Sequence, residues 1–205
     1  MDFTQLASRE AQLKTVAALA ERNIQAELIE TKGDALAKIK ELIPQGASVM
    51  NGASRTLEEI GYIDLLKTGG HGWNNLHDVI LAEKDPAKQA QLRKESVLSD
   101  FYLGSVHGLA QTGEMVIASN TGSQLPHLVF TSPNLVLVVG AQKITPTLTD
   151  GLTRLDEHVI PLEDARMMAA YKMGTQKSKT LIFHRENKMM GRIVKVLIVN
   201  EKLGF

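Results

Sequence analysis

The sequence predicts an α/β fold built on a mixed sheet with helices on both of its faces. In the first half of the chain, strand-like and helix-like segments alternate, which is the order that places helices against a sheet. The run Leu135–Val139 is continuously apolar and ends at Gly140, as is typical of a central strand covered on both faces. Further strand-like segments follow later and add strand pairs to this sheet.

The chain has 205 residues, which suits one domain spanning 1–205. A globular chain of this size buries roughly 70% of the surface that it exposes when unfolded, which is enough for a hydrophobic core without disulfides or bound metals. No internal repeat, low-complexity tract or convincing linker divides it.

The N-terminal region predicts a helix followed by a strand. Leu6, Leu13 and Val16 recur at helical spacing, so we expect an amphipathic helix over Phe3–Arg22. Apolar and polar residues then alternate over Ile24–Ile29, which predicts a strand.

The next segment predicts a second helix and a second strand. Asp34 is a candidate N-cap for a helix that runs to about Ile43, where Pro44 and Gly46 end it. Ser48–Met50 is then a short strand.

A third helical segment follows this strand directly. We expect a helix over Arg55–Ile60, with Thr56 and Glu59 at the spacing of a capping box. Tyr62–Lys67 adds a helical turn, whereas His71–Glu83 fits no single pattern.

The middle of the chain predicts one helix and two strands. Asp85 precedes Pro86, a good helix start, and this helix runs to about Leu98. Phe101–Val106 and Met115–Ala118 have strand composition, with Gly113 in the turn between them.

The C-terminal part continues the alternation. We expect one or two helical turns over Leu125–Phe130. Helices are predicted at Thr149–Glu157 and Leu162–Tyr171, and strands at Thr180–Phe183 and Val194–Val199.

Charge and composition argue against several functional classes. The 23 Lys and Arg balance 23 Asp and Glu, so the chain lacks the basic footprint of nucleic-acid or anionic-membrane binding. It has no cysteine, which excludes disulfides, thiolate catalysis and a Cys-ligated iron–sulfur cluster on this chain. Because no signal sequence and no run of about 18 apolar residues is visible, we expect a cytoplasmic protein.

A polar loop at Asn51–Thr56 follows one predicted strand and opens a helix. Ligands of open α/β sheets bind beyond the carboxyl ends of strands. Gly52 allows close backbone approach, Asn51 and Ser54 offer polar groups, and Arg55 has the forked donor that suits a carboxylate or phosphate. The alternative is an ordinary helix cap with a solvated Arg55.

A second polar loop lies in a stretch without charge. Between Glu114 and Lys143 the chain has no Asp, Glu, Lys or Arg, which usually marks the centre of a protein. Within it, Asn120, Thr121 and Gly122 can form a nest of backbone donors for an anion. The same residues are also common in simple strand-to-helix turns.

Lys143, Thr112 and Gly113 are further candidates for this anion site, and His107 is a candidate for proton transfer. Lys143 follows the apolar strand and is well placed for an anionic ligand, although it can equally be the first solvated residue after that strand. Thr112 and Gly113 form a polar turn. His107 precedes that turn and is a candidate acid or base, or else a structural histidine.

The sequence shows no metal site and no nucleotide fingerprint. His71 and His77 have no Asp, Glu or Cys at metal-ligand spacing. Neither a P-loop nor a G-x-G-x-x-G motif is present, and no cofactor is implied.

Taken together, five segments resemble the LUD (lactate utilisation) domain family across nearly the whole chain and in the family's order. They are Met50–Gly61 with the following Asp64–Leu66, Leu103–Gly108, Gln111–Pro126, Val138–Pro146 and Leu197–Phe205. The resemblance implies a fold of the NagB/RpiA/CoA-transferase-like superfamily, an α/β core with a Rossmann-like sheet.

The resemblance also implies an association with oxidation of L-lactate, in which partner subunits carry iron–sulfur clusters. Because CoA transferases of the superfamily use a glutamate nucleophile, it makes Glu114 a candidate catalytic residue. Family members often have Glu-Thr-Gly where this chain has Gln111-Thr112-Gly113, with its carboxylate after the glycine.

The functional hypothesis is a subunit or accessory protein of lactate (2-hydroxy acid) utilisation. It would bind a small anionic ligand: a carboxylate, a phosphate or a CoA ester. One alternative is a non-catalytic module that binds or assembles a redox partner, and another is a CoA-transferase-like acyl-transfer enzyme. Whether the chain is an enzyme, and whether it forms a homo-oligomer, stays open at this stage.

Overall fold

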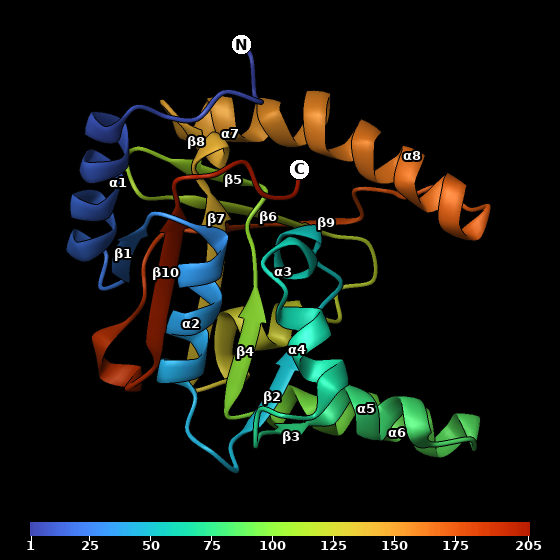
Figure 1. Ribbon diagram of the computed structural model, residues 1–205. Coiled ribbons are helices and arrows are strands. Elements are labelled where there is room, and N and C mark those ends of the chain that lie inside the picture. The colour runs from blue at the N-terminus through green and yellow to red at the C-terminus, as the bar shows by residue number, and fades with distance from the viewer.

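A computed structural model describes residues 1–205 and contains two sheets with helices around them (Figure 1). The strands are β1 (Gln25–Ile29), β2 (Ser48–Asn51), β3 (Asn74–Asn75), β4 (Phe101–Gly104), β5 (Gly108–Ala110), β6 (Met115–Ser119), β7 (Asn134–Gly140), β8 (Ile144–Thr145), β9 (Lys179–Phe183) and β10 (Ile193–Val199). The α-helices are α1 (Arg9–Glu21), α2 (Lys32–Leu42), α3 (Arg55–Glu59), α4 (Tyr62–Thr68), α5 (Leu76–Ala82), α6 (Pro86–Glu95), α7 (Leu148–Arg154) and α8 (Ile160–Tyr171). Single turns of 3-10 or π-helix lie at Ser96–Leu98, His127–Thr131, Ala141–Lys143, Leu155–Val159 and Lys188–Met190.

The main sheet has six strands in the order β1-β10-β7-β4-β2-β3, and every neighbouring pair is parallel. The second sheet, β8-β5-β6-β9, holds the antiparallel pairs. The predicted α/β fold with a Rossmann-like sheet and helices on both faces is confirmed. The main sheet is wholly parallel, whereas the second sheet combines two antiparallel pairs with one parallel pair, β5–β8.

The apolar strand β7 shows why this arrangement is stable. Leu135, Leu137 and Val139 pack into a core shared with α1 and the second sheet, whereas Val136 and Val138 face a core shared with α2, α3 and α4. A third, smaller cluster joins the far face of the second sheet to α7 and the turn after it. The strand is therefore covered on both faces, as its unbroken apolar run predicts.

Several predicted helix starts were wrong, because other side chains cap the helices. The first helix begins at Arg9 rather than Phe3, since Ser8 Oγ accepts the N–H of Ala11. Thr31 caps α2 in a capping box with Asp34, which was the predicted cap.

Ser54, and not Thr56, caps the third helix by accepting the N–H of Leu57. The ambiguous stretch His71–Glu83 contains β3 and α5, capped by Asn75. Strand Phe101–Val106 ends at Gly104, and the partner of β6 across the Gly113 turn is β5, which the sequence did not predict.

Helix α6 begins at Pro86, directly after its N-cap Asp85, as predicted. None of the helices is long and apolar enough to cross a bilayer.

Candidate functional site

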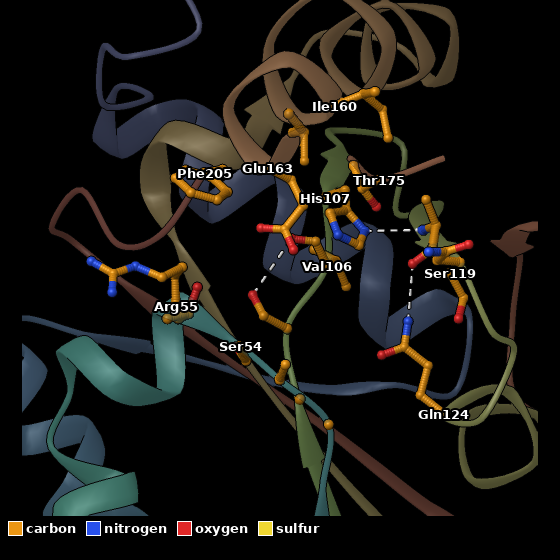
Figure 2. A pocket seen from close by; sticks show the side chains of 18 of the residues that line it. Ser54, Arg55, Val106, His107, Ser119, Gln124, Ile160, Glu163, Thr175 and Phe205 are labelled. Carbon is orange, nitrogen blue, oxygen red and sulfur yellow. Dashed lines mark hydrogen bonds between the residues drawn. The ribbon is translucent and has the colours of Figure 1, made fainter. Parts of the chain in front are cut away.

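A cavity of about 250 Å³ opens beyond the carboxyl ends of three adjacent strands, β2, β4 and β7. The two polar loops meet there. Gly52–Thr56 lines one side, and Ser119–Thr121 with Ser123 and Gln124 lines another. The remaining wall comes from the β4–β5 connection, the turn after β7, and residues on or beside α8 (Figure 2). Two turns far apart in the sequence therefore share one hollow.

The close approach of the two loops depends on Gly52. A Cβ atom at this position would lie 2.8 Å from the hydroxyl oxygen of Tyr102 and 3.2 Å from Oε1 of Gln124. Gln124 is itself fixed, because its Nε2 donates to the carbonyl oxygen of Ala118 at 3.0 Å (Figure 2). Glycine is thus required for this wall of the cavity.

Lys143 is a buried cation at the cavity wall. Its residue is only 3% exposed, and Nζ donates to Thr56 Oγ1 at 2.9 Å and to Ser105 Oγ at 3.1 Å. Burial, helped by the positive charge of Arg154 and opposed by Glu59, lowers the pKa of Lys143 to about 7. The sequence placed a cation here, but only the structure shows that hydroxyl groups hold it.

Arg154, in the last turn of α7, is a second buried cation. It is 0% exposed, and Nη1 donates to the carbonyl oxygen of His107, while Nε and Nη2 have no hydrogen-bond partner. Burial lowers its pKa to about 10. None of the ion pairs in the structure includes Arg154 or Lys143. Sequence reasoning missed Arg154, because nothing local marks a helix arginine as buried.

His107 lines the cavity as a fixed, neutral group. Its Nδ1 accepts the backbone N–H of Ala118 at 3.0 Å, which places the ring proton on Nε2 (Figure 2). Burial and the charges of Lys143 and Arg154 lower the pKa of His107 to about 3. At neutral pH the ring is therefore a hydrogen-bond donor rather than a titrating acid or base, which favours the structural histidine among the two alternatives that the sequence left open.

Glu163 and Arg166, on α8, also line the cavity and were not predicted. Arg166 donates to both carboxylate oxygens of Glu163, at 2.7 and 2.6 Å, and this pairing raises the pKa of Arg166. Figure 2 shows the Glu163 carboxylate directed toward Val106 and the cavity. Their i, i+3 spacing was the only sequence signal.

Of the predicted site residues, seven line the cavity: Gly52, Ser54, Arg55, His107, Asn120, Thr121 and Lys143. Arg55 is nevertheless occupied, because its guanidinium pairs with Glu58 at 2.7 Å and Glu59 at 3.6 Å. In Figure 2 its side chain extends away from His107.

The other five predicted site residues lie elsewhere. Asn51 is buried beside a smaller cavity of about 180 Å³ that it shares with His77 and His127. Gly122 packs on the side chain of Lys179, 2.9 Å from the position of a Cβ atom.

Thr112, Gly113 and Glu114 form the β5–β6 turn and do not line the cavity. Arg22 holds this turn, since Nε donates to the carbonyl oxygen of Thr112 at 2.6 Å and Nη2 pairs with the Glu114 carboxylate. Burial alone would raise the pKa of Glu114, but the Thr112 hydroxyl and Arg22 outweigh burial and lower it. A carboxylate tied in this way has a structural role at the turn, and it is absent from the wall where the candidate nucleophile was expected.

No group of three or more His, Cys, Asp and Glu side chains is arranged to hold a metal ion. His71 instead stacks on Trp73, with ring centroids 5.0 Å apart, and its Nδ1 accepts the backbone N–H of Trp73.

Comparison with known proteins gives one family match. The model of the LUD domain family matches residues 13–199. No curated protein sequence matches the chain. A DUF162 family protein from Deinococcus radiodurans has a similar structure, with 11% identity, a TM-score of 0.57, and coverage of 96% of this chain and 100% of that one. At this identity the likeness shows a shared fold only. Ribose 5-phosphate isomerase A from Methanocaldococcus jannaschii also aligns, at 11% identity over 97% of this chain and 98% of that one, with a TM-score of 0.39.

Proposed function

Because this chain belongs to the LUD domain family, we propose that it binds a small carboxylate or phosphate anion in the cavity beside Lys143 and serves the utilisation of 2-hydroxy acids such as lactate. One observation carries the proposal: Lys143 lines this cavity as a buried cation without a carboxylate ion-pair partner, and Arg154, bonded to the carbonyl oxygen of the lining residue His107, is a second unpaired buried cation just outside the lining. Burying a charge without a counter-charge is costly, and an anion in the cavity would offset that cost.

The cavity wall supplies donors suited to such an anion. Ser54, Ser119, Thr121 and Gln124 contribute hydroxyl and amide groups, and His107 contributes an N–H. The volume of about 250 Å³ is below the roughly 300–1,000 Å³ of sites for drug-sized ligands. The site therefore suits an acid of a few carbons, or the acyl end of a larger ester.

Acyl transfer through Glu114 is not favoured, because that carboxylate is bound to Arg22 outside the cavity. Oxidation of a hydroxy acid also needs an electron acceptor. Since this chain has no cysteine, any iron–sulfur cluster in such a reaction would belong to a partner subunit.

Thermal-shift screening with L-lactate, pyruvate, inorganic phosphate and CoA tests the proposal. A ligand present at 100 times its dissociation constant adds about 2.7 kcal/mol to the free energy of unfolding. We expect a shift with a small carboxylate or phosphate that is lost in Lys143→Met and kept in Lys14→Met, a matched change at an exposed lysine. A shift that survives Lys143→Met, or no shift with any of these anions, would contradict the proposal.

A further inference from the structure

We propose that Lys143 is a nucleophile that forms a reversible imine with the keto group of a small 2-oxo acid in this cavity. The inference rests on the proposed anion site and adds covalent chemistry to it. It identifies the ligand class as carboxylates with an adjacent carbonyl group, such as pyruvate.

The first argument is the identity of the groups that hold the amine. Nζ of Lys143 contacts the hydroxyls of Thr56 and Ser105, and no carboxylate lies within ion-pair distance. A carboxylate would fix the amine as an ammonium ion, whereas a hydroxyl oxygen can accept a hydrogen bond from the N–H of an ammonium or of a neutral amine, and the hydroxyl protons of Thr56 and Ser105 are directed to the carbonyl oxygens of Leu203 and Val106. The contacts therefore orient Nζ in either protonation state.

The second argument is electrostatic. Arg154 is buried nearby and its charge, together with the loss of solvation, opposes protonation of the amine. The pKa of about 7 leaves a large fraction of Lys143 neutral at neutral pH, unlike an ordinary lysine with a pKa near 10.5. Desolvation beside another cation is an established way of activating a lysine toward carbonyl groups.

The third argument is that two more groups lining the same cavity suit a 2-oxo acid. The loop residues Ser119, Asn120 and Thr121 can accommodate its carboxylate. The neutral ring of His107 has its proton on Nε2, which has no partner within the chain and can donate to the keto oxygen. Such a donor polarises the carbonyl and stabilises the negative charge that develops on its oxygen.

The step balances without an oxidant or a reductant. The lone pair of neutral Nζ attacks the keto carbon, and the electron pair of the C=O bond moves to oxygen, which takes up one of the two Nζ protons through the surrounding hydroxyls or water. The C–O bond of this carbinolamine then breaks as the C=N bond forms. The oxygen leaves as water with the second Nζ proton.

Hydride trapping tests the inference on the intact chain. Incubation with pyruvate and cyanoborohydride at neutral pH should reduce the imine to a stable carboxyethyl-lysine, and peptide mapping by mass spectrometry should locate it at Lys143. L-lactate, which has no keto group, should give no adduct. Lys143→Arg, which keeps a cation, should lose the adduct, and Lys14→Met should retain it.

The outcomes separate this inference from the anion site itself. A pyruvate-induced thermal shift without any adduct would overturn the imine and leave the binding proposal standing. Labelling spread over exposed lysines, or retained in Lys143→Arg, would also overturn it. The wild-type peptide map decides the question even if Lys143→Arg does not fold.

Discussion

The amine of Lys143 lies 2.9 Å from the hydroxyl oxygen of Thr56, a residue 87 positions earlier in the chain. This contact ties the turn after β7 to α3, and Thr56 in turn donates to the carbonyl oxygen of Leu203 at 3.3 Å. Three distant segments are therefore joined through one threonine hydroxyl at the cavity wall.

Removing this hydroxyl should destabilise the protein. Thr56 is 1% exposed, and Thr56→Val keeps its shape but leaves the buried amine with Ser105 as its only partner. We expect the free energy of unfolding to fall by about 1–3 kcal/mol, the cost of an unsatisfied buried polar group. Urea denaturation measures this, with Thr56→Ser as the control that keeps the oxygen. A valine variant as stable as the wild type would show that the contact contributes nothing.

Replacing Lys143 by methionine should make the unliganded protein more stable, most clearly at low pH. Folding lowers the pKa of Lys143 from 10.5 to about 7, so the folded protein carries the full cost of the buried charge below pH 7. Between pH 7 and 10.5 the folded state has released this proton while the unfolded state retains it, so wild-type stability should rise with pH.

The difference between Lys143→Met and wild type isolates this lysine from other titrating groups. Denaturation curves should give Lys143→Met a higher free energy of unfolding than wild type at pH 6. This difference should be smaller at pH 9.5, and Lys14→Met should show neither effect. A gap that widens with pH would refute the assignment of the titration to Lys143.

The sequence was a good guide where one local pattern determines the structure. The run Leu135–Val139 is a central strand because both of its faces are buried. The Asn51–Thr56 loop reaches the cavity because it follows a parallel strand, and the carboxyl ends of such strands lie at one edge of the sheet.

The site could not be predicted where distant side chains determine it. The Thr112–Glu114 turn has the same polar composition as a binding loop, but Arg22 occupies it. The guanidinium of Arg55 is already paired with Glu58 and Glu59 of its own helix. The burial of Arg154 depends on how α7 packs over the second sheet, which no local pattern in the helix reveals.

Gly52→Ala should impair ligand binding more than folding. Its Cβ atom would lie 2.8 Å from Tyr102 Oη and 3.2 Å from Gln124 Oε1, so the wall between the two loops has to shift. Overpacking of this kind costs about 1–3 kcal/mol, and we expect it mainly as a loss of affinity measured by calorimetry. Gly70→Ala, where nothing lies within 4 Å, is the matched control. Unchanged affinity in Gly52→Ala would argue that the ligand does not use this wall.

Glu114→Gln should lower stability without changing ligand binding. The Glu114 carboxylate pairs with Arg22 and accepts the Thr112 hydroxyl, in a partly buried turn outside the cavity. We expect a loss on the order of 1 kcal/mol from the weakened charge-assisted bonds, seen in denaturation curves. If Glu114→Gln instead abolished binding or turnover at unchanged stability, the carboxylate would belong to the functional site after all.

His107 should make the protein sensitive to acid. Folding lowers the pKa of His107 from 6.5 to about 3. As the pH falls through this window, the unfolded state binds a proton that the folded state does not bind, so the free energy of unfolding declines. His107→Gln keeps an acceptor for the Ala118 N–H but cannot titrate, so its stability should fall less than that of wild type between pH 7 and pH 4. Part of the slope should remain, because burial also lowers the pKa of His127 to about 4.

The measurement is urea denaturation at both pH values, with His184→Gln at an exposed histidine as the control. Equal slopes for wild type and His107→Gln would mean that His107 is protonated as easily in the fold as in the unfolded chain, and its assignment as a neutral donor in the cavity would fail.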